Sequence, residues 1–392
     1  PLRPQEITVA EVLQQAGWAT GHFGKWHLGT VRADSPLSPG QQGFDEWLSA
    51  PNFFELSPKL SHNGVPTQTT GEGSEVIVEA AVKFIRGAVE QKQPFLAVVW
   101  FGSPHNPHIA TAEDRLAYTD QIPALQHYYG EITAMDRALG QLRTGLRELG
   151  VAENTLLWYT SDNGPQGPND RRPGSAGGLR GRKGSLWEGG IRVPCLIEWP
   201  ARVAKPRQSS IPAGTVDILP TVLEVAGLQA KQPDRPLDGT SLVPLLNGKM
   251  ESRDKPLGFW VYPGRGIPMR SGEIVDALEE ELADSSTPRT VDQLTPAERG
   301  EIPRTYSLDQ FPGHAAWADG RFKLHQLPAG KGGDFRYLLY DLEADPAEQT
   351  NLVNREPERV RAMQQALRKW QVSVLQSANG EDYSQGRKPA GE

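Results

Sequence analysis

The sequence predicts an α/β protein, with a mostly parallel sheet flanked by helices and a smaller α+β subdomain towards the C-terminus. Two observations lead to this prediction. Helical patterns alternate with short apolar runs over residues 74–199, and after residue 250 several strand-like runs follow one another before a final amphipathic helix. Strands separated by helices favour a parallel sheet with right-handed crossovers. We therefore expect an α/β domain over residues 1–255 and a C-terminal subdomain over residues 256–392.

The first helix is expected to begin at Thr8. Thr8 and Glu11 have the spacing of a capping box, and Gly17 can end the helix in the left-handed conformation. The next segment, "WATGHFGKWHLG", is short, aromatic and rich in glycine, which is typical of a strand that runs into a loop. If this segment is extended, Lys25 and His27 project to the same side, because side chains alternate along a strand.

Two further strands are expected to end in polar loops. Residues 74–91 have helical spacing, and the apolar run over residues 94–101 is followed by "GSPHNPH". Residues 127–150 then form an apolar helical face, and the strand-like "TLLWYTS" is followed by "DNGP". Loops at the carboxyl ends of parallel strands meet at one edge of a sheet, where ligands bind. The residues expected at that edge are His105, His108, Asp162 and Asn163.

A basic loop precedes the next strand. Residues 177–200 begin with a glycine-rich stretch that contains Arg180, Arg182 and Lys183, and they continue into the strand-like "VPCLIEW". Glycines let the backbone approach a ligand closely, and the positive charges favour an anionic group as that ligand. Cys195 lies inside the apolar strand, so we expect it in the core.

The C-terminal part contains strand-like runs and a long insertion. "LGFWVYP", "HAAWADGRFKLHQL" and "YLLYDL" suggest antiparallel strands, with Asp319 and Gly320 as a hairpin turn. Residues 264–311 are rich in Pro, Glu, Ser and Thr and form a long insertion, with a short acidic helix expected around residues 274–283. We expect this insertion to contribute most to substrate choice. The final helix carries apolar residues on one face: Val360, Met363, Leu367 and Trp370.

Composition excludes several classes of protein. The 392 residues carry a formal net charge of -7 and contain one cysteine. Nucleic acid is therefore not an expected partner, and an intrachain disulfide framework or a cysteine-based zinc cluster is excluded. We find no transmembrane segment and no signal peptide, because no apolar stretch is long enough and the chain has no basic-then-apolar start. The motifs of serine hydrolases and of P-loop proteins do not occur.

Five segments together resemble the type I sulfatases, the arylsulfatase-like branch of the alkaline phosphatase superfamily. They occur in the order and approximate spacing of that family, from about Ile7 to about Leu352. The resemblance implies an alkaline-phosphatase-like fold and the hydrolysis of sulfate monoesters to an alcohol and inorganic sulfate. The segments are "FGKWHLG", "SPHNPH", "SDNGP", "GRKGSLWEGGIRVP" and "ADGRFKL…YDLEADP".

The resemblance also implies roles for individual residues. Lys25 and Lys183 resemble the two lysines that bind the sulfate. His27 resembles the histidine beside the nucleophile, and His105 resembles the histidine that meets the leaving-group oxygen. Cations and donors of this kind stabilise the charge that develops when a sulfate ester is cleaved.

Asp162 and Asn163 resemble two ligands of an active-site calcium ion. Calcium takes six to eight oxygen ligands, so two residues cannot complete its shell. In the family, two aspartates at the end of a first strand supply further ligands, and a C/S-x-P-x-R motif downstream provides the formylglycine nucleophile. Neither feature occurs here. The resemblance therefore implies an N-terminally truncated form, inactive as given, whose remaining calcium ligands come from the missing segment.

Two alternatives stay open. One is a phosphoester hydrolase of the same superfamily, which uses Ser or Thr as nucleophile and commonly two zinc ions. The other is a non-catalytic relative that only binds sulfated glycans. The single-metal style of "SDNGP" and the lysine in "GKWHLG" favour sulfate. We expect a sulfated small molecule or glycan as the partner, and the family's usual export implies a periplasmic or secreted protein.

Overall fold

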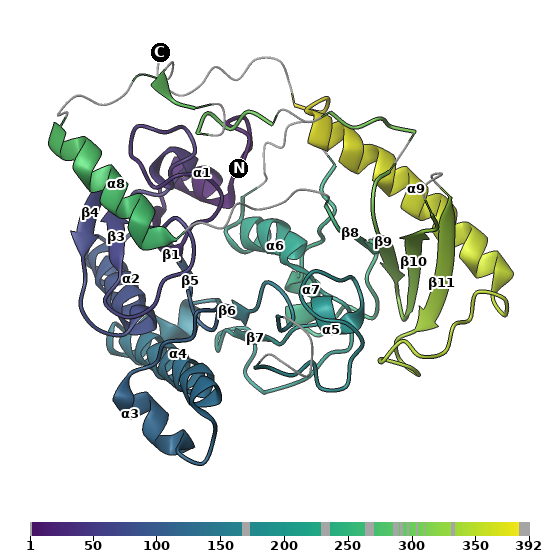
Figure 1. Cartoon of the computed structure of the whole chain (residues 1–392), viewed down its shortest axis with the longest axis horizontal. Coiled ribbons are helices and arrows are strands. Elements are labelled where there is room, and N and C mark those ends of the chain that lie inside the picture. Colours follow the sequence, from purple (N-terminus) through teal and green to yellow (C-terminus); the bar gives the residue numbers. More distant parts are fainter. Residues whose placement is uncertain are drawn as a thin grey trace. The chain divides into compact units, whose positions relative to one another are not determined.

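The structure is a computed structural model of the chain (Figure 1). The described residues divide into two compact units: Pro1–Glu153 with Ile267–Pro303, and Asn154–Gly266 with Arg304–Gln385. Each unit is described on its own. The residues that the structure describes are 2–166, 173–228, 236–262, 270–284, 290, 293–295, 298–302, 305–309, 311–330 and 334–383.

The sheet of the first unit is mixed. Its five strands lie in the order β4-β3-β2-β1-β5. The central β1 (Ala19–Lys25) pairs in parallel with β2 (Glu46–Ala50) and with β5 (Phe95–Trp100). β3 (Lys59–His62) and β4 (Val65–Gln68) form an antiparallel hairpin beside β2. The α/β class is confirmed, and the parallel part of the sheet carries its carboxyl-terminal loops at one edge.

Helices cover both faces of this sheet. α1 (Val9–Gln15) begins with the predicted capping box, in which the side chains of Thr8 and Glu11 each bind the other residue's backbone N–H. α2 (Gly73–Glu90) and α4 (Pro123–Glu148) pack against each other, and α2 also packs on β1. Successive residues of β1 face opposite sides: Phe23 packs on Phe84 of α2, and His22 packs on the other face.

The acidic helix expected around residues 274–283 is present as α8 (Ser271–Asp284), and it belongs to the first unit. α8 lies along β3 and β4 (Figure 1). Lys59 Nζ lies 2.5 Å from Asp276 and 2.7 Å from Glu279 on this helix. Val275 enters the same apolar cluster as Trp26 and Trp47. The helix is thus fixed to the sheet, whereas residues 264–269 of the expected insertion lie outside the described residues.

The second unit contains a two-stranded and a four-stranded sheet. β6 (Leu157–Thr160) pairs antiparallel with β7 (Cys195–Glu198), not in parallel as the helix-strand alternation suggests. Cys195 is exposed, so its expected place in the core is wrong: it opens this short strand, whose first two residues face solvent. The same unit contains three short helices in its described residues: α5 (Glu188–Ile191), α6 (Ile218–Val225) and α7 (Val243–Leu246).

The larger sheet is antiparallel, as predicted. Its order is β11-β10-β9-β8, and the hairpin between β9 and β10 turns at Gly320 and Arg321, one residue later than predicted, because Asp319 still pairs with Phe322. One side of this sheet packs on α9 (Pro357–Asn379) through Val360, Met363 and Leu367 (Figure 1). The strands are β8 (Leu257–Trp260), β9 (Ala315–Asp319), β10 (Phe322–Pro328) and β11 (Phe335–Asp341).

The division into units differs from the boundary predicted at residue 255. Residues 154–255 group with the C-terminal sheet, because among the described strands β6 and β7 pair only with each other and add nothing to the sheet of the first unit. In the described part of the chain, no helix has both the length and the apolar character needed to span a bilayer.

Candidate functional site

Lys25 and His27 lie where β1 ends. Gly24 has a φ of 105°, and a Cβ on it would come within 2.0 Å of the Trp100 carbonyl oxygen, so only glycine fits here. The strand stops at Lys25 and His27 adopts a φ of 49°. The extended conformation from which we expected Lys25 and His27 to project to the same side ends at Lys25, so that shared side stays a prediction.

The segment after β2 connects this corner to His105. The backbone N–H groups of Trp26 and His27 donate to the carbonyls of Ala50 and Pro51, at 2.8 and 3.1 Å. Two residues further on, the ring of Phe53 stacks on the ring of His105, with centroids 4.5 Å apart and planes 10° apart. The structure thus brings Lys25, His27 and His105 to the same edge of the sheet. Phe53 has no motif that marks it in the sequence.

His105 and His108 have different partners. His105 Nδ1 lies 2.6 Å from the Asn106 carbonyl oxygen, which can only accept a hydrogen bond, so Nδ1 carries the proton. His108 Nδ1 lies 3.1 Å from Glu131, a buried carboxylate that also accepts from the Ile109 N–H at 2.6 Å. His108 therefore anchors the loop to α4, whereas the second nitrogen of His105 is the one suited to a substrate.

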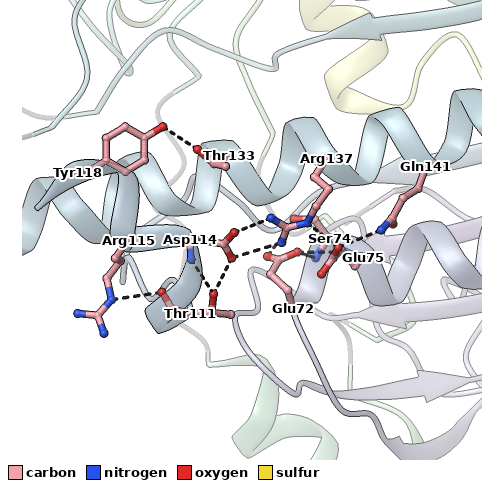
Figure 2. A network of polar contacts seen from close by, with 10 residues as sticks. All are labelled: Glu72, Ser74, Glu75, Thr111, Asp114, Arg115, Tyr118, Thr133, Arg137 and Gln141. Atoms are coloured by element: carbon pink, nitrogen blue, oxygen red, sulfur yellow. Dashed lines mark hydrogen bonds and ion pairs between the residues drawn. The ribbon is translucent and has the colours of Figure 1, made fainter.

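A polar network fixes the segment that follows this loop (Figure 2). Thr111 caps α3 (Ala112–Arg115), and Asp114 on that helix is buried. Arg137 on α4 donates to Asp114 at 2.6 Å and to Glu75 on α2 at 2.8 Å. Burial raises the pKa of Asp114, but hydrogen bonds from Arg137 and Thr111 outweigh it, and the pKa lies below its usual value. Arg137 thus links α4 to α3 and to α2, in the segment that follows the loop of His105 and His108.

Asp162, Asn163 and Lys183 come together in the second unit. Asp162 and Asn163 follow β6, and the next residue, Gly164, donates its N–H to the Gly190 carbonyl at 2.9 Å. The N–H of Lys183 donates to the Pro165 carbonyl at 3.0 Å. Two backbone hydrogen bonds therefore hold the basic loop beside the end of β6, and both Asp162 and Lys183 are exposed there.

The three basic residues of this loop do not all offer charge to a ligand. Arg182 is buried, and its guanidinium donates to the carbonyls of Gln166 and Gly174. The guanidinium of Arg180 lies 3.6 Å from the ring centre of Trp187. The expectation that all three charges serve an anion is corrected for Arg182, whose guanidinium is buried and bound to the protein's own carbonyls, while Arg180 and Lys183 are both exposed and Arg180 also packs on Trp187.

Asp162 and Asn163 supply oxygen atoms of the type that calcium prefers. The Asn163 amide nitrogen donates to the Gly164 carbonyl at 3.0 Å, which leaves the amide oxygen available for a cation. Within the described ranges no group of three or more His, Cys, Asp or Glu side chains could hold a metal ion. The donors fit calcium in type, but they supply only part of its shell.

Lys25, His27 and His105 belong to the first unit, and Asp162, Asn163 and Lys183 belong to the second. The shared sheet edge expected for His105, His108, Asp162 and Asn163 stays a prediction.

The fold by itself identifies the structural class of the protein. Among solved structures, that of Ps i-CgsB in complex with k-i-k-neocarrahexaose superposes with a TM-score of 0.73 at 22% identity, and the match covers 97% of this chain and 81% of that one. The shared architecture is the alkaline-phosphatase-like fold, a mixed sheet flanked by helices with a smaller antiparallel sheet.

Sequence comparison identifies the family within this class. The Sulfatase family model matches residues 1–228. Arylsulfatase A of Homo sapiens is 30% identical over 423 aligned positions, which cover 98% of this chain and 75% of the relative. Steryl-sulfatase of Rattus norvegicus is 29% identical, over 66% of this chain and 58% of the relative. The chain belongs to the sulfatase family, as a type I sulfatase of the alkaline phosphatase superfamily.

Proposed function

We propose that this chain forms most of an enzyme that hydrolyses sulfate monoesters to an alcohol and inorganic sulfate. The observation that carries the proposal is the attachment of the Lys183 loop to the end of β6, because it holds an exposed cation beside Asp162 and Asn163. A cation and oxygen ligands for a metal are the groups that stabilise the negative charge of a transferring sulfuryl group.

Each of the polar groups described above then has a role. Lys25 and Lys183 bind sulfate oxygens, and His27 lies beside the attacking group. His105 donates a proton to the departing oxygen from Nε2, because Nδ1 is already committed to the Asn106 carbonyl. Asp162 and Asn163 contribute to a calcium site, and calcium, when bound, neutralises charge on the sulfate oxygens.

The attacking group and the remaining calcium ligands come from sequence outside these 392 residues. The chain contains neither C-x-P-x-R nor S-x-P-x-R, the motif that carries formylglycine in the sulfatases it resembles. The sheet of the first unit supports an additional strand: among the described strands β5 lies at the end of the sheet and pairs only with β1, and its Trp100 has 43% of its surface exposed. By itself the chain is therefore inactive and exposes an apolar strand edge.

The substrate is a sulfated glycan or a sulfated small molecule. Carrageenan is the ligand of the solved structure compared above, and aryl and steryl sulfates appear in the names of the curated relatives. We also propose that the enzyme acts outside the cytoplasm, where extracellular sulfated glycans occur.

A direct test uses the complete protein, expressed from its full reading frame with a formylglycine-generating enzyme. It should hydrolyse 4-nitrophenyl sulfate in preference to 4-nitrophenyl phosphate, and a chelator should abolish the activity. Lys25→Ala and Lys183→Ala should each lower kcat/KM by roughly a hundredfold or more, on the scale of losing one preorganised charge. Lys205→Ala, an exposed lysine, is the control and should change nothing.

Three results would contradict the proposal. A preference for the phosphate ester would favour a phosphoester hydrolase. Binding of sulfated oligosaccharides without turnover would favour a non-catalytic protein. Hydrolysis of 4-nitrophenyl sulfate by the 392 residues alone, surviving Lys25→Ala, would rule out the mechanism described here.

A further inference from the structure

Four acidic or amide side chains in the turn at the end of β11 differ in their partners. The segment "YDLEADPAEQTNL" begins with the last two residues of the strand. Asp341 accepts from the N–H groups of Glu343 and Ala344, Asp345 accepts from those of Gln349 and Thr350, and Asn351 accepts from the N–H of Leu339. These three side chains bind the backbone of the turn or of β11, and Asp341 also pairs with Arg321 in the turn between β9 and β10. The side chain of the fourth residue, Glu348, makes no such contact.

Glu348 reaches from this turn into the second unit's interior. Its side chain has no exposed surface. One carboxylate oxygen lies 2.9 Å from Lys323 Nζ and 2.7 Å from His325 Nε2, and the other accepts from the Glu188 N–H at 2.6 Å. Its backbone carbonyl accepts from Arg180 at 3.1 Å. Glu348 thus contacts two residues of β10 and two residues of the basic loop.

A buried lysine lies between two carboxylates in this cluster. Lys323 is completely buried on β10 and lies 2.6 Å from Glu188 and 2.9 Å from Glu348. Burial raises the pKa of Glu348, but the His325 hydrogen bond and the Lys323 charge outweigh it, so the pKa lies below its usual value. Burial also lowers the pKa of His325.

Glu348 also adopts a backbone conformation that side chains avoid. Its φ of 55° lies in the left-handed region, which is unfavourable for a residue with a Cβ. Glycine would occupy this position without that cost. A glutamate here is consistent with its carboxylate and carbonyl contacts offsetting the strain.

The two loop residues that Glu348 contacts are the two ends of the Lys183 loop. Arg180 opens the loop and Glu188 ends it, and the Gly189 N–H closes the loop on the Arg180 carbonyl at 2.7 Å. Gly189 and Gly190 are packed so closely on the loop backbone that a Cβ on either would come within 2.2 Å of a carbonyl oxygen. The loop is therefore compact, and its two ends lie together.

We propose that Glu348 is a positioning residue that fixes both ends of the Arg180–Glu188 loop and thereby holds Lys183 at the end of β6. The proposal rests on the function proposed above for Lys183. Glu348 contacts neither sulfate nor the reacting atoms, so its effect passes through the loop alone.

Hydrogen exchange tests the positioning without any activity. In Glu348→Gln, exchange at the Glu188 and Lys183 amides should speed up by about tenfold or more, because the loop opens locally. The Leu352 amide, which donates to the Leu339 carbonyl, should exchange as before if the fold is intact. Glu343→Gln is the matched control: it makes the same chemical change at a carboxylate that is 72% exposed in the same turn.

Kinetics of the complete enzyme test the consequence for catalysis. Glu348→Gln should lower kcat for 4-nitrophenyl sulfate by about tenfold or more, with KM changed less than about threefold, because a misplaced charge mainly affects the transition state. Glu348→Asp keeps the charge but is one methylene shorter, so it should lose less. If Glu348→Gln does not fold, Glu348→Asp is judged by the same criteria.

The outcomes separate the two proposals. Wild-type kcat and wild-type exchange at Glu188 and Lys183 in both variants would overturn the positioning role, as would faster exchange at Leu352 equal to that in the loop. Faster loop exchange in a protein that hydrolyses no sulfate ester would leave the positioning intact and overturn the proposed function.

Discussion

His105 and His108 lie three residues apart, yet their imidazoles have unlike surroundings. His108 is held by the buried Glu131, while the ring of His105 is fixed by stacking on Phe53 and by one hydrogen bond from Nδ1. A ring held in this way keeps Nε2 in a constant direction. If His105 protonates the departing oxygen, the rate enhancement that it provides increases with the basicity of that oxygen.

Replacement of His105 should therefore affect substrates unequally. In the complete enzyme, His105→Ala should lower kcat/KM by roughly a hundredfold or more for alkyl sulfates and far less for 4-nitrophenyl sulfate, whose leaving group departs without a proton. The measurement is a series of aryl and alkyl sulfates of increasing leaving-group pKa. Equal losses across the series would remove His105 from the acid role.

The residues of the candidate site were chosen from sequence motifs, and their roles stay predictions. Lys25 and Lys183 are exposed or half-buried near ends of strands, as expected. The exposure of Cys195 was predicted wrongly, because it depends on where the strand begins rather than on its apolar pattern. Glu348 follows the quoted "YDLEADP" by two residues and was given no role, since its partners Arg180 and Glu188 lie 168 and 160 residues away along the chain.

The helices that surround the histidine loop depend on one arginine. Arg137 connects α4 to α3 through Asp114 and to α2 through Glu75 (Figure 2). The Asp114 side chain is 2% exposed, so water cannot replace the guanidinium as its partner. Without Arg137 the Asp114 carboxylate would stay buried but would lose the positive charge that compensates for its desolvation.

Arg137→Met should destabilise the protein by about 1–3 kcal/mol, the cost of leaving a buried polar group unsatisfied. Arg86→Met, at an exposed position on α2, serves as the control and should have little effect. The midpoint of urea unfolding measures both variants. A loss in Arg86→Met as large as that in Arg137→Met would show that the network in Figure 2 contributes nothing specific.

Individual helices and strands were predictable because their patterns are local. The capping box of α1, the apolar face of α2 and the β9–β10 hairpin all appear as expected. The pairing between strands was harder to predict. β3 and β4 add an antiparallel hairpin to the first sheet, and β6 pairs with β7. Short polar strands such as β4 lack the apolar runs that identify strands in a sequence, and partner choice depends on contacts far apart in the chain.

Over the whole molecule, buried histidines make stability depend on pH. Burial lowers the pKa of His22, in the first unit, to about 3, and that of His314, in the second, to about 4, from ordinary values of 6.5. Between pH 6.5 and 4 the unfolded chain therefore binds more protons than the folded protein at these positions. Acid in this range must favour unfolding.

The thermal unfolding midpoint should accordingly fall as the pH is lowered from 7 to 5, a range above the ordinary pKa values of carboxylates. His22→Asn keeps a polar group near Ser49, whose hydroxyl lies 2.7 Å from His22 Nδ1, and removes the titration. Its midpoint should depend less on pH than that of the wild type. Parallel pH profiles for the two proteins would mean that His22 does not contribute.

The two units are each built from separate stretches of chain. The first begins with Pro1–Glu153 but takes α8 from beyond residue 266, and the second begins at Asn154 but takes its larger sheet and α9 mainly from beyond residue 304. During synthesis, a ribosome delivers the first half of both units before it completes either. Lys59 can therefore pair with the acidic side chains of α8 only after Asn154–Gly266 has been synthesised. Neither unit can finish folding before most of the other has left the ribosome.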